Sequence, residues 1–270
     1  MTLPARRRLS HSGQWAELSR DELTDHGVML SIGGVEQSHV ELGDPDFLLH
    51  DYLRRMRSVL TTWSAEQHGR VSGSVLHLGA GALTLPRWIS HWRPGTEQTV
   101  VDIEPELVTF VLEHLPMTPA PENIVGDAAT VLTAEGALSG RSFATVVVDL
   151  FNSAAAPAAL TSPEFFRFVW AAVAPGGLML VNMGDDAGMT FAKGLTQTIV
   201  DALALGPGCC LLSAPADVVE GEAEGNLVFA ASHHTFSEAE LGQIWAAGPH
   251  PAEVLSGDEL QLWWGNTEPH

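Results

Sequence analysis

The sequence predicts an α/β fold: a Rossmann-like, doubly wound, seven-stranded and mostly parallel sheet, with a small N-terminal β element. Three observations support this prediction. From Val71 onward, apolar runs of strand length alternate with segments of helical periodicity. The runs are rich in Val and Leu, as expected for strands that helices cover on both faces. The first run leads into a Gly-x-Gly turn, and acids follow several of the others.

The chain is expected to begin with a small β element and a linking helix, over residues 1–60. Its first 16 residues show no regular pattern and are expected to be irregular. Two β-like runs then flank Gly33-Gly34, which indicates a hairpin. Asp44-Pro45 predicts the start of a helix, with Asp44 as the N-cap and Tyr52 on its apolar stripe.

Residues 61–235 are expected to form a Rossmann-like domain. Its predicted strands are 74–79, 99–103, 123–125, 145–150, 177–182, 208–213 and 226–231. Its predicted helices lie near 84–92, 105–114, 128–135, 162–173 and 187–204. The last strand follows its predecessor without a clear helix, which indicates an antiparallel hairpin at one sheet edge. Residues 236–270 are expected to hold one helix and then an irregular end.

The composition narrows the classes of partner. The 270 residues include 33 Asp and Glu but only 13 Lys and Arg, a formal net charge of −20. Nucleic acid needs a basic face, whereas this charge attracts a cationic substrate or simply keeps the protein soluble. Cys209 and Cys210 are adjacent, so they are expected neither to bridge nor to frame a metal site. No apolar run spans a bilayer and no signal-peptide pattern is present, which predicts a cytoplasmic protein without a membrane partner.

A nucleoside-binding half-site is predicted around Gly79-Ala80-Gly81. The two glycines let the backbone approach a ligand, and the next helix aims free N–H groups at it. A tight strand-to-helix turn explains the same glycines equally well. Just over twenty positions after this turn, a second apolar run ends at Asp102, which is suited to bind ribose hydroxyls. Glu104 is expected to serve at the start of the following helix.

Acids also follow three later strands. Asp127 either caps the helix that starts at Ala128 or accepts a hydrogen bond from an adenine amino group. Asp149 ends a fully apolar strand and enters an Ala-rich loop, which favours a general base or an amine ligand over a simple cap. Asp185 borders the same cleft or only caps the next helix. His77 is expected to be a packed core residue, and no metal-ligand spacing, nucleophile elbow or P-loop is found.

These strand-end residues resemble the spermidine synthase-like (polyamine aminopropyltransferase) branch of the class I S-adenosylmethionine-dependent methyltransferase fold. The resemblance covers roughly Val28 to Ser232. Its more specific carriers are the hairpin with Gln37-Ser38 and the string Gly81-Ala82-Leu83-Thr84-Leu85-Pro86-Arg87. The others are Asp44-Pro45 to Met56, His77 to Ala80, Val101-Asp102-Ile103-Glu104, Gly126-Asp127-Ala128, Val148-Asp149, Leu160-Thr161 to Phe165, Ala174-Pro175-Gly176-Gly177 and Gly225-Asn226-Leu227-Val228.

The resemblance implies a role for each matching residue. Gln37 contacts the nucleoside or its sulfur-side tail, and Asp102 holds the ribose hydroxyls. Asp127, with Ala128, accepts from the adenine amino group. Asp149 orients and deprotonates an attacking amine. The implied co-substrate is decarboxylated S-adenosylmethionine, the implied acceptor is a small cationic amine such as putrescine, and a homodimer is expected because such relatives are often dimers.

The sequence departs from this family at two positions. Spermidine synthases resemble Gly-Gly-Gly-Asp-Gly at the glycine turn, where the Asp grips the aminopropyl ammonium, and here that position is Ala82. They also carry Asp-x-x-Asp after the fourth strand, and here the pair is Asp149 and Asn152. Because a desolvated ammonium needs a carboxylate partner, Asp185 joins Asn152 as a candidate substrate ligand.

Three functions therefore stay open. The first is aminopropyl transfer. The second is methyl transfer from S-adenosylmethionine to a small molecule, because a site without an acid at Ala82 no longer disfavours the carboxylate of the intact cofactor. The third is a nucleoside-binding relative that has lost its amine site.

Overall fold

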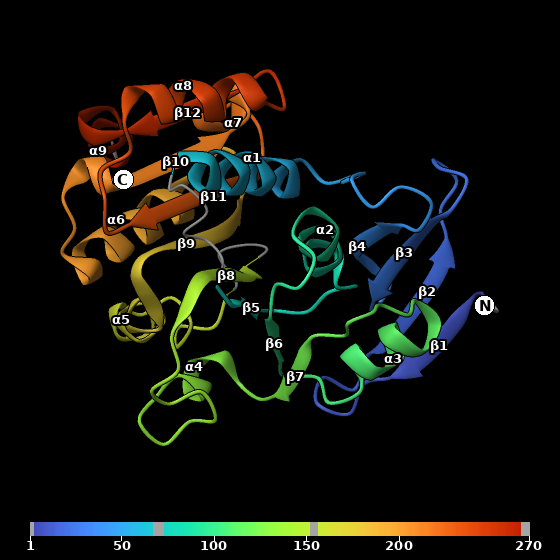
Figure 1. Ribbon diagram of the computed structural model, residues 1–270. Coiled ribbons are helices and arrows are strands. Elements are labelled where there is room, and N and C mark those ends of the chain that lie inside the picture. Colours follow the sequence, from blue (N-terminus) through green and yellow to red (C-terminus); the bar gives the residue numbers. More distant parts are fainter. Residues whose placement is uncertain (1–2, 67–72, 152–155, 266–270) are drawn as a thin grey trace.

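The computed structural model describes residues 3–66, 73–151 and 156–265, which form an α/β body beside a smaller β sheet (Figure 1). Among these residues the central sheet has eight strands in the order β12-β10-β11-β9-β8-β5-β6-β7, one more than predicted. The strands are β5 Val75–Leu78, β6 Gln98–Asp102, β7 Glu122–Val125, β8 Phe143–Phe151, β9 Val173–Asp185, β10 Cys210–Ala214, β11 Gly225–Ser232 and β12 Glu253–Ser256. The predicted mostly parallel α/β architecture is confirmed.

Two details of this sheet differ from the prediction. β7, β6, β5, β8 and β9 are parallel neighbours, but β11 lies between β9 and β10 and runs antiparallel to both. The predicted antiparallel pairing of this strand with its predecessor is confirmed, but its predicted place at the sheet edge is wrong. The edge is β12, which pairs with β10 and lies in the tail that was expected to be irregular. Its four residues are too few to show a strand period, so backbone pairing with β10 decides its conformation.

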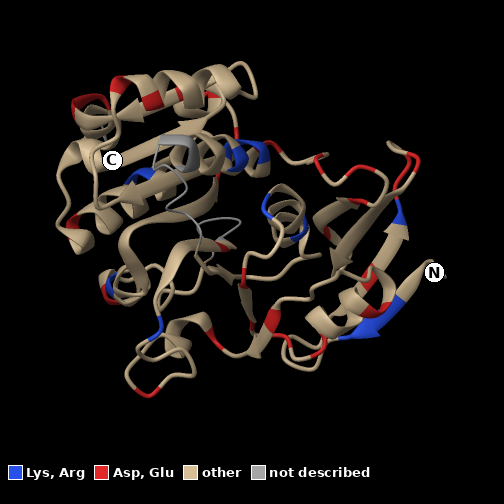
Figure 2. Cartoon of the chain, in the orientation of Figure 1, with Lys and Arg blue, Asp and Glu red and all other residues tan. Residues whose placement is uncertain are grey.

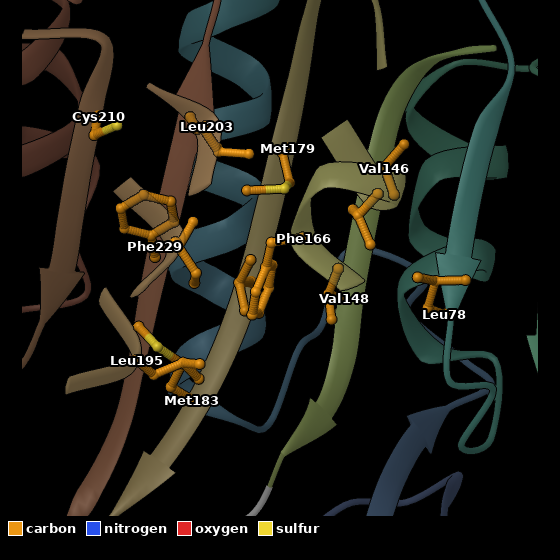
Figure 3. Close-up of a cluster of buried hydrophobic side chains, with 14 of the residues drawn as sticks. Leu78, Val146, Val148, Phe166, Met179, Met183, Leu195, Leu203, Cys210 and Phe229 are labelled. Atoms are coloured by element: carbon orange, nitrogen blue, oxygen red, sulfur yellow. The ribbon is translucent and has the colours of Figure 1, made fainter. Parts of the chain in front are cut away.

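Helices cover both faces of the sheet. They are α1 Asp51–Glu66, α2 Thr84–Trp92, α3 Leu107–His114, α4 Ala128–Val131, α5 Pro163–Ala171, α6 Thr190–Leu203, α7 Ala216–Val219, α8 Glu238–Ala247 and α9 Gly257–Gly265. Successive strand residues point to opposite faces, so Val146 and Val148 join one apolar core while Val147 joins the other. Figure 3 shows the first core, where Phe166 of α5 and Met179 of β9 lie among its side chains. None of the described helices is long and apolar enough to cross a membrane.

Helix α1 begins later than predicted. It starts at Asp51, so the prediction that Asp44 caps a helix is wrong. The Asp44 carboxylate instead accepts the Asp46 N–H (3.0 Å), and the Asp44 carbonyl accepts the Phe47 N–H (3.1 Å). This local turn competes with helix formation, as short acidic side chains often do. The later start places Tyr52 in the first turn of α1.

The N-terminal sheet is a four-stranded antiparallel meander among the described residues. Its strands are β1 Ala5–Arg8, β2 Trp15–Arg20, β3 Gly27–Ile32 and β4 Val35–Glu41. The predicted hairpin is confirmed, with Gly33 and Gly34 at φ of 61° and 85°. The prediction that residues 1–16 are irregular is wrong, because β1 and the start of β2 lie there. Three arginines lie on β1 (Figure 2), where Arg6 pairs with Glu17 of β2, and this charge conceals the strand pattern.

The central strand β5 contains one buried histidine, as predicted. His77 is 3% exposed, and its Nε2 lies 2.9 Å from Oε1 of Gln98. Burial lowers the pKa of His77 from 6.5 to about 4. The contact with Gln98 raises this pKa, but by less than burial lowers it. The unfolded state therefore binds more protons than the folded state as the pH falls from 6.5 to 4, and stability decreases in that window.

We expect His77→Gln, whose amide can still pair with Gln98, to weaken this acid sensitivity. Between pH 7.5 and pH 4.5 the unmodified protein should lose roughly 2 kcal/mol more of its free energy of unfolding than the variant. Urea denaturation at the two pH values measures the difference. Equal losses in both proteins would show that His77 is not the group responsible.

Candidate active site

The carboxyl ends of β5, β6 and β8 meet at the glycine turn. The Gly79 N–H donates to the Val101 carbonyl of β6 (2.9 Å). A Cβ on Gly79, which has φ of 99°, would lie only 2.3 Å from the carbonyl oxygen of Asp149 in β8. Gly79 is therefore required both for its backbone conformation and for the close contact of three strand ends. Tight packing accounts for this glycine, and it also brings the turn beside Asp149.

The N-terminal sheet lies against the same turn. A Cβ on Gly81 would lie 2.3 Å from Oγ of Ser38 in β4. The Thr84 hydroxyl at the start of α2 donates to the His39 carbonyl at 2.8 Å. These contacts hold β4 on the turn, and Gln37 is the strand residue that precedes Ser38. The structure thus brings together the two segments that carry the more specific part of the resemblance.

Asp102 ends β6 and faces the glycine turn. Its Oδ2 accepts the Ala80 N–H (3.0 Å) and its Oδ1 accepts the Glu104 N–H (2.9 Å). Desolvation raises the pKa of Asp102, and these two N–H donors oppose the increase. Each carboxylate oxygen can accept a second hydrogen bond, so Asp102 can still bind hydroxyl groups. Glu104 is buried, and instead of serving α3 its carboxylate accepts the N–H groups of His11 and Ser12.

Asp127 lies at the neighbouring strand end. Its exposed carboxylate caps α4 through a hydrogen bond from the Ala129 N–H (2.8 Å). The Gly126 N–H donates to the Asp102 carbonyl (2.9 Å), which joins the two acidic segments. Capping uses Oδ1, so both roles that the sequence left open are compatible with the geometry. Ala128 is buried as the first residue of α4.

Two apolar side chains next to these acids stay exposed. Ile103 is 39% exposed and Val125 is 49% exposed. Apolar surface that follows directly after the ribose candidate Asp102 and shortly before Asp127 suits a flat base. The sequence analysis did not single out these residues, although their positions beside the two acids were a usable signal.

Asp149 is held by two side-chain donors. The Tyr52 hydroxyl of α1 donates to Oδ2 (3.1 Å), and Nδ2 of Asn182 in β9 donates to Oδ1 (2.9 Å). The Asp149 side chain is partly exposed, but protein surrounds it closely. The resulting desolvation raises the pKa of Asp149, and the two donors oppose this increase. An accessible carboxylate with a raised pKa beside the glycine turn suits proton transfer.

Asn182 has a further partner. Nδ2 of Asn226 in β11 donates to Oδ1 of Asn182 at 3.0 Å. The sequence analysis missed Tyr52, Asn182 and Asn226 as site residues. Tyr52 was assigned to an apolar stripe, Asn182 to a strand, and Asn226 to a strand motif of the resemblance without a role. Their proximity to Asp149 follows from tertiary packing, and no local motif indicated it.

Of the two predicted substrate ligands, Asp185 and Asn152, only Asp185 lies among the described residues. Both Asp185 oxygens accept backbone N–H groups, Oδ1 from Asp186 (2.9 Å) and Oδ2 from Ala192 of α6 (2.8 Å). Asp185 therefore satisfies an N–H group in the first turn of α6, whose N-cap is Met189, and its role as a substrate ligand stays a prediction. Asn152 lies outside the described residues.

A cavity of about 440 Å³ opens beside Tyr52 and Asn226. Asp217 and Glu224 line it from the segment between β10 and β11, and none of its described lining residues is Lys or Arg. Nε2 of His50, another lining residue, is buried without a hydrogen-bond partner among the described residues. This lining suits a cation that donates N–H groups. A different cavity, of about 610 Å³, lies at the amino ends of the strands, away from Asp149.

The chain is similar in sequence to two curated proteins. It is 27% identical over 183 residues to the polyamine aminopropyltransferase of Chromobacterium violaceum, which covers 64% of this chain and 66% of the relative. It is 29% identical over 153 residues to the polyamine aminopropyltransferase of Neisseria meningitidis serogroup A, over 54% of this chain and 53% of the relative. The match thus spans between half and two thirds of these relatives. No protein-family profile matches the chain.

Solved structures show the same fold. The chain aligns with human methyltransferase-like protein 13, a complex with SAH, with a TM-score of 0.57 and 14% identity over 82% of this chain and 95% of the other. Its fold is therefore that of class I methyltransferases. A probable spermidine synthase from Corynebacterium glutamicum aligns over 100% of this chain and 96% of its own, with a TM-score of 0.86 and 25% identity. Within the class I fold, the chain is thus similar in sequence and in structure to proteins of the spermidine synthase-like branch.

Proposed function

We propose that this protein transfers an aminopropyl group from decarboxylated S-adenosylmethionine to a small cationic amine such as putrescine. The observation that carries the proposal is the Asp149 carboxylate, which lies beside the glycine turn and accepts from Tyr52, a lining residue of the acid-lined cavity. A nucleoside site on one side and a cation site on the other are what such a transfer requires. The aminopropyltransferase names of the sequence relatives support the proposal.

In this proposal the adenosyl part binds across β5, β6 and β7. Asp102 accepts the ribose hydroxyls, and Ile103 and Val125 contact the faces or edge of the adenine. Asp127 accepts from the adenine amino group through Oδ2, because the capping of α4 engages only Oδ1. Gln37 contacts the sulfur-side tail from β4. The hydrogen bonds that Asp102 and Asp127 receive from the backbone hold both acids ready for these contacts.

The chemistry of the transfer assigns one clear task to Asp149. A neutral amine nitrogen of the acceptor attacks the aminopropyl carbon that is bound to the sulfonium. The new C–N bond forms as the C–S bond breaks, and the sulfur leaves as the neutral thioether of methylthioadenosine. Asp149 accepts the proton that the acceptor nitrogen loses. Its raised pKa brings it closer to the working pH, which makes it a better base than an exposed aspartate.

The acceptor's second positive charge needs a partner, because Asn152 replaces an acid of the family pattern, and Ala82 replaces the acid that grips the aminopropyl ammonium of the co-substrate. Ala82 is fully buried, so that position offers neither charge nor space. Asp217 and Glu224 line the cavity beside Tyr52 and supply negative charge close to the proposed base. We propose that the distal ammonium of the acceptor enters this cavity.

The experiment is incubation of the purified protein with decarboxylated S-adenosylmethionine and putrescine. Mass spectrometry should detect spermidine and methylthioadenosine in equal amounts. No product at high enzyme concentration, including with longer diamines, would reject the proposal. Sedimentation analysis in the same preparation tests the homodimer that we also expect, and fractionation of the source cells tests a cytoplasmic location.

Methyl transfer is the second candidate, and Ala82 is the observation that favours it. An apolar residue at that turn does not repel the carboxylate of intact S-adenosylmethionine. Calorimetric titration with the intact cofactor, the decarboxylated cofactor and methylthioadenosine ranks the two functions. Tighter binding of the intact cofactor than of the decarboxylated form would favour methyl transfer, and the reverse order would favour aminopropyl transfer.

A further inference from the structure

Asn226 lies two hydrogen bonds away from Asp149. It donates to Oδ1 of Asn182, whose Nδ2 donates to Oδ1 of Asp149. The two asparagines come from neighbouring antiparallel strands, in which Asn226 is opposite Gly184 and Asn182 is opposite Val228. Residues two positions apart lie on the same face of a strand, so the two side chains are diagonal neighbours. Only the antiparallel insertion of β11 beside β9 creates this pair.

The orientation of the Asn182 amide determines whether a hydrogen-bond donor or an acceptor faces the Asp149 carboxylate. In one orientation the amide gives Asp149 a donor, and in the reversed orientation it presents an oxygen that repels the carboxylate. Asn182 is 1% exposed, so an unpaired amide oxygen there is costly. The Asn226 donor satisfies that oxygen only when Nδ2 of Asn182 faces Asp149.

We propose that Asn226 is a positioning residue, which acts through Asn182 to keep Asp149 an oriented carboxylate. Its catalytic consequence rests on the proposed function of Asp149, whereas the effect on protonation does not. Asn226 also lines the acid-lined cavity, so an amine in that cavity would meet the outer end of the same chain of hydrogen bonds. The chain of hydrogen bonds thus couples β11 to the charge state of a residue in β8.

Tyr52 completes the arrangement from α1. It is the titratable side chain that donates to Asp149, and it stays protonated because desolvation and the Asp149 charge both raise its pKa. With Tyr52 on Oδ2 and Asn182 on Oδ1, each carboxylate oxygen holds one donor and keeps capacity for another. The acceptor nitrogen can then approach a carboxylate that does not rotate.

The test is a direct titration of Asp149 by carbon-detected NMR of aspartate-labelled protein, with the signal assigned through Asp149→Asn. Asn182→Leu keeps the side-chain shape but removes the donor, and should raise the titration midpoint by about one to two pH units. Asn226→Ala should raise it by roughly half a pH unit. The double variant should match Asn182→Leu alone, because Asn226 acts only through Asn182.

Asn123→Ala provides the matched control, since Asn123 is exposed on β7 and far from this chain of hydrogen bonds. It should leave the midpoint unchanged. No effect of Asn226→Ala, or an equal effect with and without Asn182, would overturn the inference. Asn182→Ser replaces Asn182→Leu if the latter does not fold.

The titration needs no co-substrate, so its result is valid even if the protein transfers no aminopropyl group. In an active protein, the acidic limb of the pH profile of kcat/KM should shift to higher pH together with the NMR midpoint. A purely structural role for Asn226 would lower the melting temperature and leave both midpoints in place.

Discussion

Asp149→Asn is expected to lower kcat for aminopropyl transfer by about 10²–10⁴-fold, the usual contribution of a general base. The amide keeps the size of the side chain but cannot take the proton from the acceptor amine. Oδ1 of the new asparagine can still accept from Asn182, but its Nδ2 cannot accept from the Tyr52 hydroxyl. Steady-state assays with decarboxylated S-adenosylmethionine and putrescine measure the loss.

Nucleoside binding provides the internal check on this variant. Methylthioadenosine lacks the acceptor amine, so its affinity should change by less than about threefold when only the base is removed. Asp201→Asn, an exposed carboxylate on α6, is the matched control and should keep full activity. A variant at position 149 with kcat within a factor of a few of the unmodified protein would exclude Asp149 as the base.

Gly79→Ala is expected to have the largest effect on stability, on the order of 3 kcal/mol or more. An added Cβ would lie 2.3 Å from the Asp149 carbonyl oxygen, which is backbone and cannot move aside like a flexible side chain. The left-handed φ of 99° adds backbone strain. The strand ends of β5 and β8 would have to separate, so methylthioadenosine should also bind more weakly.

Gly95→Ala separates the two contributions. Gly95 has a similar φ of 88°, but a Cβ there meets nothing within 4 Å, so this variant carries the backbone strain alone. Its cost should be about 1–2 kcal/mol by urea denaturation. Equal costs for both variants would show that the close approach of the turn to Asp149 does not contribute to stability.

The sequence alone determined the parts of the site that depend on local pattern. Apolar runs and a Gly-x-Gly turn predicted strands whose carboxyl ends meet at one edge of a parallel sheet. Asp102, Asp127 and Asp149 lie at such ends, so their approximate place followed from strand order without any knowledge of packing. The hairpin at Gly33-Gly34 was predictable for the same reason, because two glycines with positive φ define a turn locally.

The tertiary structure decided what surrounds those acids. Tyr52 reaches Asp149 across 97 residues of sequence, Asn182 across 33, and Asn226 reaches Asn182 across 44. These contacts depend on where α1 begins and on the pairing of β11 with β9. The predicted start of α1 was wrong, and β11 was expected at the sheet edge rather than inside the sheet. Short-range periodicity carries no information about which distant side chains face one another, since burial and hydrogen-bond satisfaction select them only when the whole chain packs.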